Sequence, residues 1–370
     1  MELKIEKGTF LSGLYLAQGI ADRKSTMPIL ANVLIRTEGR EKLLVAATDL
    51  NVTVMAELPC KITTEGGITI GARHLHEIVR ALPGDTVSFK RADNSYAELR
   101  AGKVEYKVVG MPDRDFPKLP NHREVEFCAV EAGALLDMID KTFFSVSTDE
   151  TRYHLNGVLF DCDGGGDNAR ARMVSTDGHR LSKIERALPG GPKAQGVIIP
   201  RKGLTEIRRA LEGATGQIEL GFHKGHVFVR VGNTAISVKL IEAQFPPYEQ
   251  VIPKDSERKV QVERAALFEA LKRISIISSD KTQGVKVALS EGVLRISSDN
   301  PDLGEAREEL EVKYDGGAVT IGFNARYMID LLGPMGTDKV SLELNGELDP
   351  GVIRPVDGED YLGVVMPMRI

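Results

Sequence analysis

His179 is the residue whose neighbours come closest to a catalytic arrangement. It lies two positions after Asp177, and Ser175, Thr176 and Ser182 could supply hydroxyl groups. A hydrolase uses these residue types for proton transfer and nucleophilic attack. No nucleophile-elbow motif accompanies them, and the matching positions of the internal repeats described below lack a histidine. A histidine at the end of a strand is more often structural or part of a binding surface.

Two histidine pairs, His74 with His76 and His223 with His226, have spacings that could hold a metal ion. Each pair lacks a third ligand at a recognisable distance, and the second pair spans a predicted hairpin turn. The Gly-rich run 161–167 resembles the start of a calcium loop, but later ligand positions hold unsuitable residues, so we interpret it as a surface turn. No phosphate-binding loop is present. We predict no metal, no cofactor and no catalytic residues.

The three cysteines, Cys60, Cys128 and Cys162, are odd in number and widely spaced. This spacing fits neither a disulfide framework nor a zinc knuckle. We expect free thiols.

The composition is that of a folded protein with no overall preference for nucleic acid. The 370 residues are 42% hydrophobic and 27% charged, and 48 Lys and Arg against 53 Asp and Glu give a net charge of −5. A protein that holds DNA by neutralising phosphates usually carries a basic excess. The first residues alternate like a strand and show no signal peptide, and no apolar run is long enough to span a membrane. We therefore expect a cytoplasmic protein.

One pattern occurs three times in the chain. Residues 68–84 read as an apolar strand, a tight turn and an amphipathic helix, and residues 197–213 and 319–332 repeat this order. Matching positions 70, 199 and 321 are 129 and 122 residues apart. Each copy is long enough to close its own core, which favours duplicated domains over a solenoid.

Other landmarks keep the same interval. Asp49, Asp177 and Asp299 each follow an apolar strand pattern, and the Phe-Pro pairs at 116–117 and 245–246 both precede Pro-containing connectors. Each copy also opens with a helical pattern, at residues 10–20, 131–147 and 263–277. Two helices and several short strands per copy predict three α+β domains, which we place at 1–122, 123–254 and 255–370.

Basic residues recur in the predicted helices of all three copies. A single charge of this kind is usually a solvated helix face, but its repetition favours a shared basic lining that could follow a phosphate backbone. Acidic residues concentrate in the stretches 299–311 and 343–360. The basic helix residues are Arg73, Arg80, Arg201, Lys202, Arg208, Arg209, Lys272, Arg273 and Arg326.

The carboxyl-terminal sequence 364–370, Val-Val-Met-Pro-Met-Arg-Ile, resembles the ending of bacterial DNA polymerase III β subunits, the β sliding clamps. Further segments that resemble this family are 27–32, 48–50, 152–157, 176–181 and 199–203. They extend along nearly the whole chain. The resemblance implies three clamp domains per chain and a head-to-tail homodimer, whose six domains form a ring with helices lining the hole and sheets outside.

The resemblance also implies two kinds of contact. Duplex or primed DNA is expected to contact Lys24, Arg73, Arg152, Tyr153, His154, Arg201 and Lys202. Short peptides from DNA polymerases, the clamp loader and repair proteins are expected in a pocket formed by Leu155, Thr176, Gly178, His179, Arg180, Leu181, Pro246, Val251, Val364, Met366, Pro367 and Met368. Methionine suits such a pocket because it is flexible and can repack around several partner sequences.

For the dimer interface, the matching positions are Tyr106, Val108, Ile276 and Ile277. Three positions depart from the family pattern: His154 replaces a common tyrosine, Asp149 stands where a polar amide occurs, and Gln250 stands where some relatives have a basic residue.

We therefore predict a non-catalytic processivity factor that encircles DNA. This topological link would explain the acidic net charge, because tight phosphate contacts would hinder sliding. Two alternatives remain open at this stage. One is a hydrolase centred on Asp177 and His179, in which His179→Gln would abolish turnover. The other is a scaffold of the same fold that does not encircle DNA.

Overall fold

The computed structural model describes residues 1–21, 25–279, 282–358 and 360–369. The α-helices within these ranges are α1 (Lys7–Ile20), α2 (Ala72–Ala81), α3 (Ala132–Asp140), α4 (Arg201–Leu211), α5 (Arg264–Ser275) and α6 (Ala325–Leu332). None of the helices so described is long and apolar enough to cross a membrane.

The strands of the first third of the chain are β1 (Glu2–Glu6), β2 (Asn32–Glu38), β3 (Lys42–Thr48), β4 (Val52–Pro59), β5 (Lys61–Thr64), β6 (Gly67–Gly71), β7 (Thr86–Arg91), β8 (Tyr96–Ala101) and β9 (Val104–Met111). Those of the middle third are β10 (Cys128–Glu131), β11 (Gly157–Cys162), β12 (Arg170–Thr176), β13 (Arg180–Ala187), β14 (Ala194–Pro200), β15 (Gln217–His223), β16 (His226–Val231) and β17 (Thr234–Lys239). The last third contains β18 (Arg258–Glu263), β19 (Gly284–Ser290), β20 (Val293–Asn300), β21 (Gly304–Glu311), β22 (Val319–Asn324), β23 (Lys339–Leu344), β24 (Gly351–Pro355) and β25 (Asp360–Val365).

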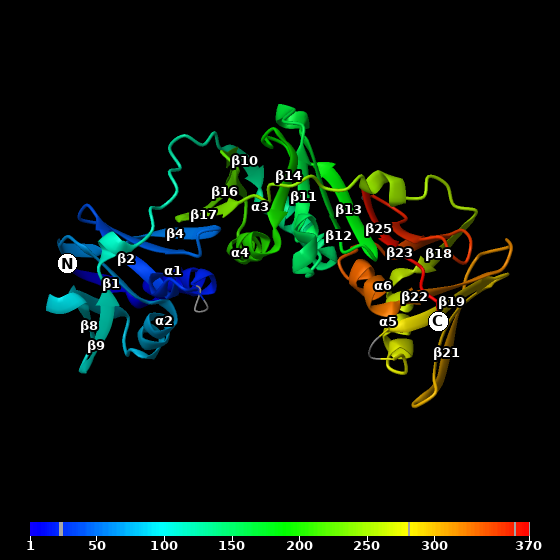
Figure 1. The fold of residues 1–370 in the computed structure, drawn as a ribbon, viewed down its shortest axis with the longest axis horizontal. Helices are drawn as coiled ribbons and strands as arrows, with labels where there is room; N and C mark the ends of the chain where they lie inside the picture. The colour runs from blue at the N-terminus through cyan, green and yellow to red at the C-terminus, as the bar shows by residue number, and fades with distance from the viewer. Residues whose placement is uncertain (22–24, 280–281, 359, 370) are drawn as a thin grey trace. The chain divides into compact units, whose positions relative to one another are not determined.

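The chain forms two compact units. Figure 1 shows the helices and strands of both. Unit 1 comprises residues 1–136 and 202–240, and unit 2 comprises 137–201 and 241–370. Unit 1 contains a thirteen-stranded sheet in the order β10-β15-β16-β17-β4-β3-β2-β6-β9-β8-β7-β1-β5. Unit 2 contains an eight-stranded sheet, β14-β11-β12-β13-β25-β24-β23-β18, and a four-stranded sheet, β21-β20-β19-β22.

The middle third of the chain supplies strands to both units. β17 pairs antiparallel with β4, with Ser237 opposite Thr53, and β13 pairs antiparallel with β25, with Leu181 opposite Val364. A strand at the edge of a sheet exposes unpaired N–H and C=O groups, and each of these pairings satisfies them with a strand from another third of the chain. Strand pairing therefore joins the successive copies of the repeat.

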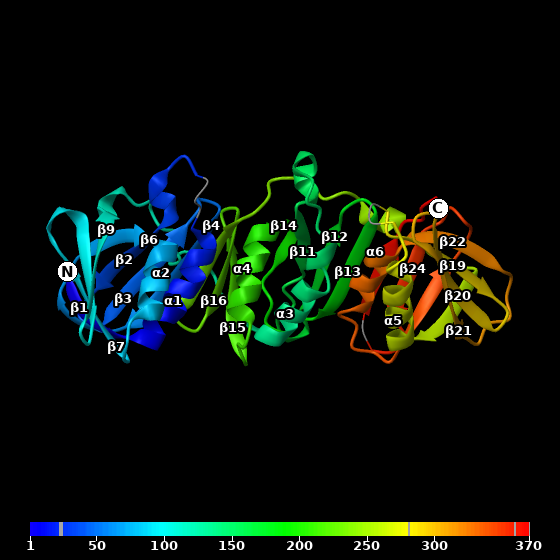
Figure 2. The same cartoon turned by 90° about the horizontal axis from the view of Figure 1, so that it is seen from below.

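The predicted order of strand, turn and helix is confirmed in all three copies. β6 leads into α2, β14 into α4 and β22 into α6. In unit 1, α2 packs beside α1, and in unit 2, α6 packs beside α5 (Figure 2). The apolar side chains of these helices face the sheets: α2 buries Leu75 and Val79, and α6 buries Met328 and Leu331.

The predicted helix at 131–147 is wrong in its second half. α3 ends at Asp140, and only a short 3₁₀ turn (η4, Phe143–Ser145) follows. The backbone carbonyls that a longer helix would use accept other donors instead. Ser182 Oγ donates to the Lys141 carbonyl, and Ser175 Oγ donates to that of Thr142 at 2.5 Å. These long-range bonds carry no local sequence signal.

Two other predicted helices shift by a few residues. The pattern at 10–20 begins three residues earlier, at Lys7, because the Glu6 side chain accepts hydrogen bonds from the backbone N–H groups of Gly8 and Thr9. The pattern at 263–277 forms the slightly shorter α5, which ends at Ser275.

Candidate functional site

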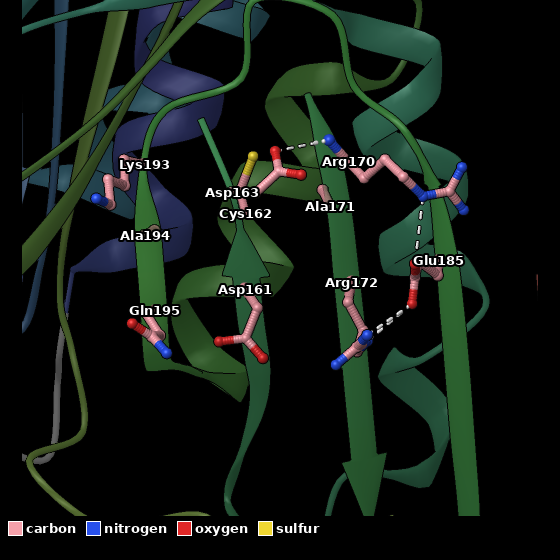
Figure 3. Close-up of a pocket in the computed structure, with 10 residues that line it drawn as sticks. All are labelled: Asp161, Cys162, Asp163, Arg170, Ala171, Arg172, Glu185, Lys193, Ala194 and Gln195. Atoms are coloured by element: carbon pink, nitrogen blue, oxygen red, sulfur yellow. Dashed lines mark hydrogen bonds and ion pairs between the residues drawn. The ribbon is translucent and has the colours of Figure 1, made fainter. Parts of the chain in front are cut away.

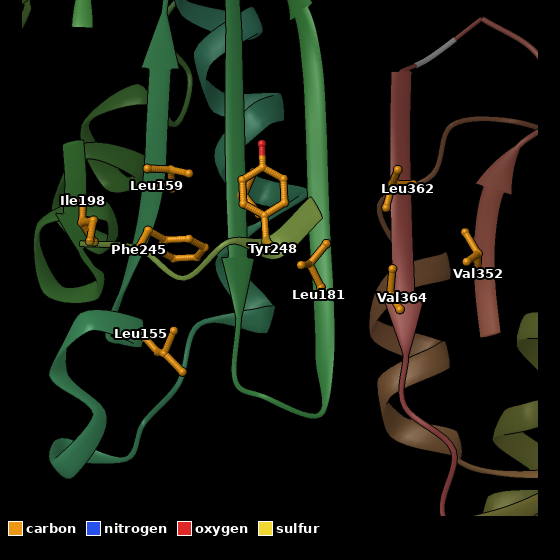
Figure 4. Packing of buried hydrophobic residues seen from close by; sticks show 10 residues of the cluster. Leu155, Leu159, Leu181, Ile198, Phe245, Tyr248, Val352, Leu362 and Val364 are labelled. Carbon is orange, nitrogen blue, oxygen red and sulfur yellow. The ribbon is translucent and has the colours of Figure 1, made fainter. Parts of the chain in front are cut away.

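A cluster of buried apolar side chains in unit 2 underlies the candidate site (Figure 4). Leu155 precedes β11, Leu181 lies on β13 and Val364 lies on β25. Leu181 and Val364 are opposite each other in the antiparallel pair, so their side chains share one face of the sheet. The complete cluster is Leu155, Leu159, Val174, Leu181, Ile198, Phe245, Tyr248, Val352, Leu362 and Val364.

The turn between β12 and β13 forms one rim above this cluster. Thr176 Oγ1 donates to the Arg180 carbonyl at 2.6 Å and accepts from the Gly178 N–H at 3.1 Å. Asp177 Oδ1 accepts from the N–H groups of His179 and Arg180, at 2.9 and 3.0 Å. Gly178 has φ +88°, a left-handed conformation that glycine adopts without strain. A Thr-Asp pair followed by glycine therefore encodes the shape of this rim.

The carboxyl-terminal segment after β25 forms the next part of the site. The N–H of Met366 donates to the carbonyl of His179 at 2.8 Å, and the N–H of Met368 donates to the carbonyl of Gly322 at 2.9 Å. The Met366 side chain stays 38% exposed, while Pro367 and Met368 are half-buried. An apolar, flexible side chain therefore stands at the surface directly beside the turn.

The connector after residue 243 packs against the same buried cluster. Phe245 and Tyr248 are buried with their rings edge to face, 6.3 Å apart, and Val251 is exposed at the end of the 3₁₀ turn Tyr248–Val251 (η7). Pro246 lines a cavity of about 540 Å³ next to Phe245. Burial, reinforced by a hydrogen bond with Glu249, raises the pKa of the Tyr248 hydroxyl to about 12.

All twelve predicted pocket residues belong to unit 2. The structure brings Leu155, Leu181 and Val364 into one cluster and joins the turn to the carboxyl-terminal segment through His179 and Met366. The structure adds Phe245, Tyr248 and Tyr327, whose ring stacks on His179 at 6.5 Å. The sequence could have indicated Phe245, because its Phe-Pro pair also occurs 129 residues earlier. No sequence pattern indicated Tyr327.

A second hollow lies on the β11–β14 face and is lined mainly by charged side chains (Figure 3). Both of its arginines pair with the same carboxylate inside the hollow. Glu185 accepts from Arg170 and Arg172, and Asp163 accepts from two backbone N–H groups. The predicted surface turn at 161–167 is confirmed for residues 163–167, which are exposed and include a short 3₁₀ segment, whereas Asp161 and Cys162 end strand β11 and Cys162 is buried. Among the residues described, no three His, Cys, Asp or Glu side chains are placed to hold a metal ion.

The hydroxyl groups near His179 are already engaged. Ser175 and Ser182 are buried and donate to backbone carbonyls, and Thr176 bonds within its own turn. Asp177 accepts from backbone N–H groups and from the Arg180 side chain. This arrangement gives the hydrolase alternative no nucleophile hydrogen-bonded to a base.

Six of the seven predicted DNA-contacting residues lie in the described part of the chain, at helix starts and in one loop. Arg73 and Lys202 are the second residues of α2 and α4, and Arg201 is the first residue of α4. Arg73 forms an ion pair with Glu77 at 2.7 Å, and Lys202 forms one with Asp49. Lys24 lies outside the described residues.

The loop residues Arg152, Tyr153 and His154 lie in the 3₁₀ segment Glu150–Leu155 (η5). Arg152 donates to Asp149 at 2.9 Å, and hydrogen bonds from Thr151 and then from Arg152 hold the pKa of the Asp149 carboxyl below its usual value. The Tyr153 side chain is exposed. A Cβ atom at Gly178 would lie 2.7 Å from Arg152 Nη1, so this loop reaches the turn between β12 and β13.

The predicted dimer residues lie on strand β9 and just after helix α5. Tyr106 and Val108 belong to β9, which pairs with β8 along its length but with β6 only at its last residues. Ile276 follows α5 and is 74% exposed, and Ile277 is half-buried. Ile276 is therefore not a core residue of this chain.

Comparisons with known proteins cover the whole chain. Residues 1–120, 129–247 and 249–369 match the N-terminal, central and C-terminal domains of the DNA polymerase III beta subunit. The chain is 34% identical to the beta sliding clamp of Pseudomonas aeruginosa and 36% identical to that of Caulobacter vibrioides, with 100% of each chain covered.

Solved structures agree with these matches. A Caulobacter crescentus beta sliding clamp with bound PEG superposes with a TM-score of 0.93 at 35% identity. A Bartonella birtlesii sliding clamp bound to griselimycin superposes with a TM-score of 0.92 at 33% identity. Both alignments cover 100% of both chains.

The resemblance seen in the sequence and the prediction of three tandem α+β clamp domains are both confirmed. The family consists of non-catalytic processivity subunits, which confirms the prediction that the chain is an accessory subunit and not an enzyme. By its three domain matches in order, its full-length relatives and its fold, the chain belongs to the DNA polymerase III beta subunit family of sliding clamps.

Proposed function

We propose that two copies of this chain join head to tail into a ring that encircles duplex DNA, and that a groove in unit 2 tethers proteins that carry short clamp-binding peptides. DNA polymerases, the clamp loader and repair proteins are the partners we propose, and the cytoplasm is the compartment. The three domains would be residues 1–122, 123–254 and 255–370. The groove of Leu155, Leu181, Val364 and Met366 carries the proposal.

The chemistry of this groove suits short apolar peptides. Its floor is a sheet face of buried leucine and valine, while Val251 and Met366 remain exposed at its sides. A bound peptide could cover Val251 and Met366, and burial of their apolar surface would favour binding. The backbone of the turn is held by its own side chains, so it need not be ordered when a peptide binds.

The helices supply a basic surface in an otherwise acidic chain. α4 carries Arg201, Lys202, Arg208 and Arg209 against the single acid Glu206, although the whole chain has a net charge of −5. We assign DNA contacts to the first turns of α2 and α4 and to the loop 152–154. A ring held by topology needs only weak phosphate contacts, which allow sliding.

Two free sheet edges support the head-to-tail dimer. Residues 104–109 of β9 pair on one side only, and β21 is the edge of the four-stranded sheet. β21 carries Glu305, Glu308, Glu309 and Glu311 against the single base Arg307, whereas at β9 Lys103 and Lys107 outnumber the single acid Glu105. Pairing of β9 with β21 of a second copy would satisfy both backbone edges and bring opposite charges together.

Retention on closed DNA tests the proposal. The protein is loaded onto nicked circular plasmid with a clamp loader, isolated by gel filtration, and then assayed before and after the plasmid is linearised. We expect retention on circular DNA and loss from linear DNA. Equal retention on both would contradict encirclement and favour a scaffold. Griselimycin, which is bound by the Bartonella birtlesii relative, is expected to compete with clamp-binding peptides.

A further inference from the structure

We infer that Arg180 and Asp330 form an ionic staple that positions the groove turn, and that Arg180 serves as a positioning residue rather than as a peptide contact. This inference rests on the proposed peptide groove. It assigns a role to Asp330, which lies on α6 and not among the predicted pocket residues.

The Arg180 guanidinium is held from three directions. Nε donates to Asp177 Oδ2 at 3.0 Å, Nη1 donates to Asp330 Oδ2 at 2.7 Å, and Nη2 donates to the Phe144 carbonyl at 2.5 Å. The three acceptors come from the turn, from α6 and from the segment after α3. Only 10% of the side chain is exposed. A guanidinium engaged in this way has little surface left for a peptide.

Aromatic rings hold the guanidinium plane as well. Its central carbon lies 4.4 Å from the centre of the Tyr327 ring and 5.4 Å from that of Phe144. Tyr327 also stacks on His179 at 6.5 Å, with 20° between the ring planes. Arg180, Tyr327 and His179 therefore form one stacked group, so displacement of Arg180 would reach the exposed His179 rim.

The staple connects the central and C-terminal domains. Arg180 and Asp177 belong to the central domain match, and Asp330 and Tyr327 belong to the C-terminal one. Both acidic partners are largely buried and each has a second bond: Asp177 to backbone N–H groups, and Asp330 to Arg326 at 3.0 Å. Buried, hydrogen-bonded charges of this kind fix geometry, because removing one partner leaves the other uncompensated.

An analogous tie occurs in unit 1 and supports the inference independently. The turn after β3 has the same bonds: Thr48 Oγ1 accepts from the Leu50 N–H at 3.0 Å, and Asp49 Oδ1 accepts from the Asn51 N–H at 2.9 Å. Val52 replaces arginine there, and the free Asp49 oxygen pairs with Lys202 at the start of α4. In both turns the aspartate is thus linked to the helix of the following domain.

The test compares Arg180→Ala with Asp330→Asn in the full-length protein, using two measurements. Hydrogen exchange of the amides of residues 179 and 180 reports the turn without any ligand. Griselimycin affinity, measured by calorimetry, reports the groove. Arg170→Ala, an exposed arginine on the neighbouring strand β12, is the matched control.

We expect both substitutions to speed exchange at residues 179 and 180 and to weaken griselimycin binding about tenfold. In the double variant the two losses should be less than additive, because they break one network. The control should change neither measurement.

Unchanged exchange and affinity in Asp330→Asn, with affinity lost only in Arg180→Ala, would overturn the staple and make Arg180 a direct contact. If griselimycin fails to bind the unmodified chain, the proposed groove is wrong, while the exchange data still support or overturn the staple.

Discussion

Two carboxylates, Asp49 and Asp177, hold copies of one turn, and the peptide groove that we propose lies beside the second. The side chains beneath the turns make the difference. Leu181 and Val364 face each other under the second turn, whereas Thr53 and Ser237 occupy the matching pair under the first. Both hydroxyl-bearing residues are buried beside an apolar cluster that includes Met55, but at this one pair they offer a peptide a more polar surface than Leu181 and Val364 do. This difference in residue type favours the second turn as the peptide site.

At the scale of single residues, Met366→Ala is expected to weaken griselimycin or peptide binding by about tenfold. The substitution removes most of the apolar side chain that a bound ligand would contact. The free energy of unfolding should change by less than about 0.5 kcal/mol, since Met366 is a surface residue. Calorimetric titration and urea denaturation measure the two quantities.

Met27→Ala is the matched control for that substitution, because Met27 is 43% exposed and Met366 is 38% exposed. Met27 lies in unit 1 and outside the groove. Equal loss of affinity in both variants would show that binding does not use the groove.

At the scale of the elements, helix α4 is unusual because a carboxylate lies on its buried face. Its buried side includes Glu206, which is 3% exposed, together with Leu204 and Ile207. Glu206 pairs with Arg209 at 2.7 Å, but burial outweighs this attraction and raises the pKa of the Glu206 carboxyl. A helix that packs an ionisable group against its neighbours makes folding sensitive to pH.

The sign of this pH effect follows from the raised pKa. The folded state binds the Glu206 proton more tightly than the unfolded state, whose carboxyl has a pKa of 4.5. The contribution of Glu206 to stability is therefore greatest below pH 4.5 and declines as pH rises through the raised value. The free energy of unfolding of the unmodified chain, minus that of Glu206→Gln, is expected to fall as the pH rises above 4.5.

Urea denaturation at several pH values measures this difference. Glu212→Gln, at an exposed carboxylate just beyond α4, is the control for loss of a negative charge near the helix end. A difference that rises with pH for Glu206→Gln would contradict the assigned pKa direction.

For the whole molecule, assembly depends on surfaces that one chain leaves uncovered. Ile276 is 74% exposed and Tyr106 lies on the open part of β9, although both are large apolar residues. Buried in the proposed dimer, they would lose contact with water, which favours association. Exposure in the single chain is thus the expected state of an interface residue.

Ile276→Asp is expected to convert a dimer to a monomer at micromolar concentration, because the proposed contact would bury an unpaired charge. Sedimentation equilibrium measures the mass. Leu348→Asp, at a leucine that is 72% exposed, is the control and should remain dimeric. A monomeric unmodified chain, or a dimeric Ile276→Asp variant, would refute this interface.

Repetition made much of the fold predictable from the sequence. Strand, turn and helix recur at matching positions because local patterning determines them, and the Thr-Asp turns follow from residues that bond within the turn. The resemblance at 364–370 and the other segments predicted the family. The groove residues were predicted through that resemblance, since spacing alone does not bring residue 155 to residue 364.

Only the tertiary structure determined the features that depend on hydrogen bonds between residues distant in the chain. α3 stops at Asp140 because serines of β12 and β13 bond to the carbonyls that follow, and Arg180 is held by Asp330, 150 residues away. Local periodicity carries no record of such bonds, since each donor and acceptor is compatible with many partners until the sheets form. The sequence by itself therefore determined the three copies and most of their elements, and only the folded chain determined where α3 ends and which charged groups bond to Arg180 in the turn between β12 and β13.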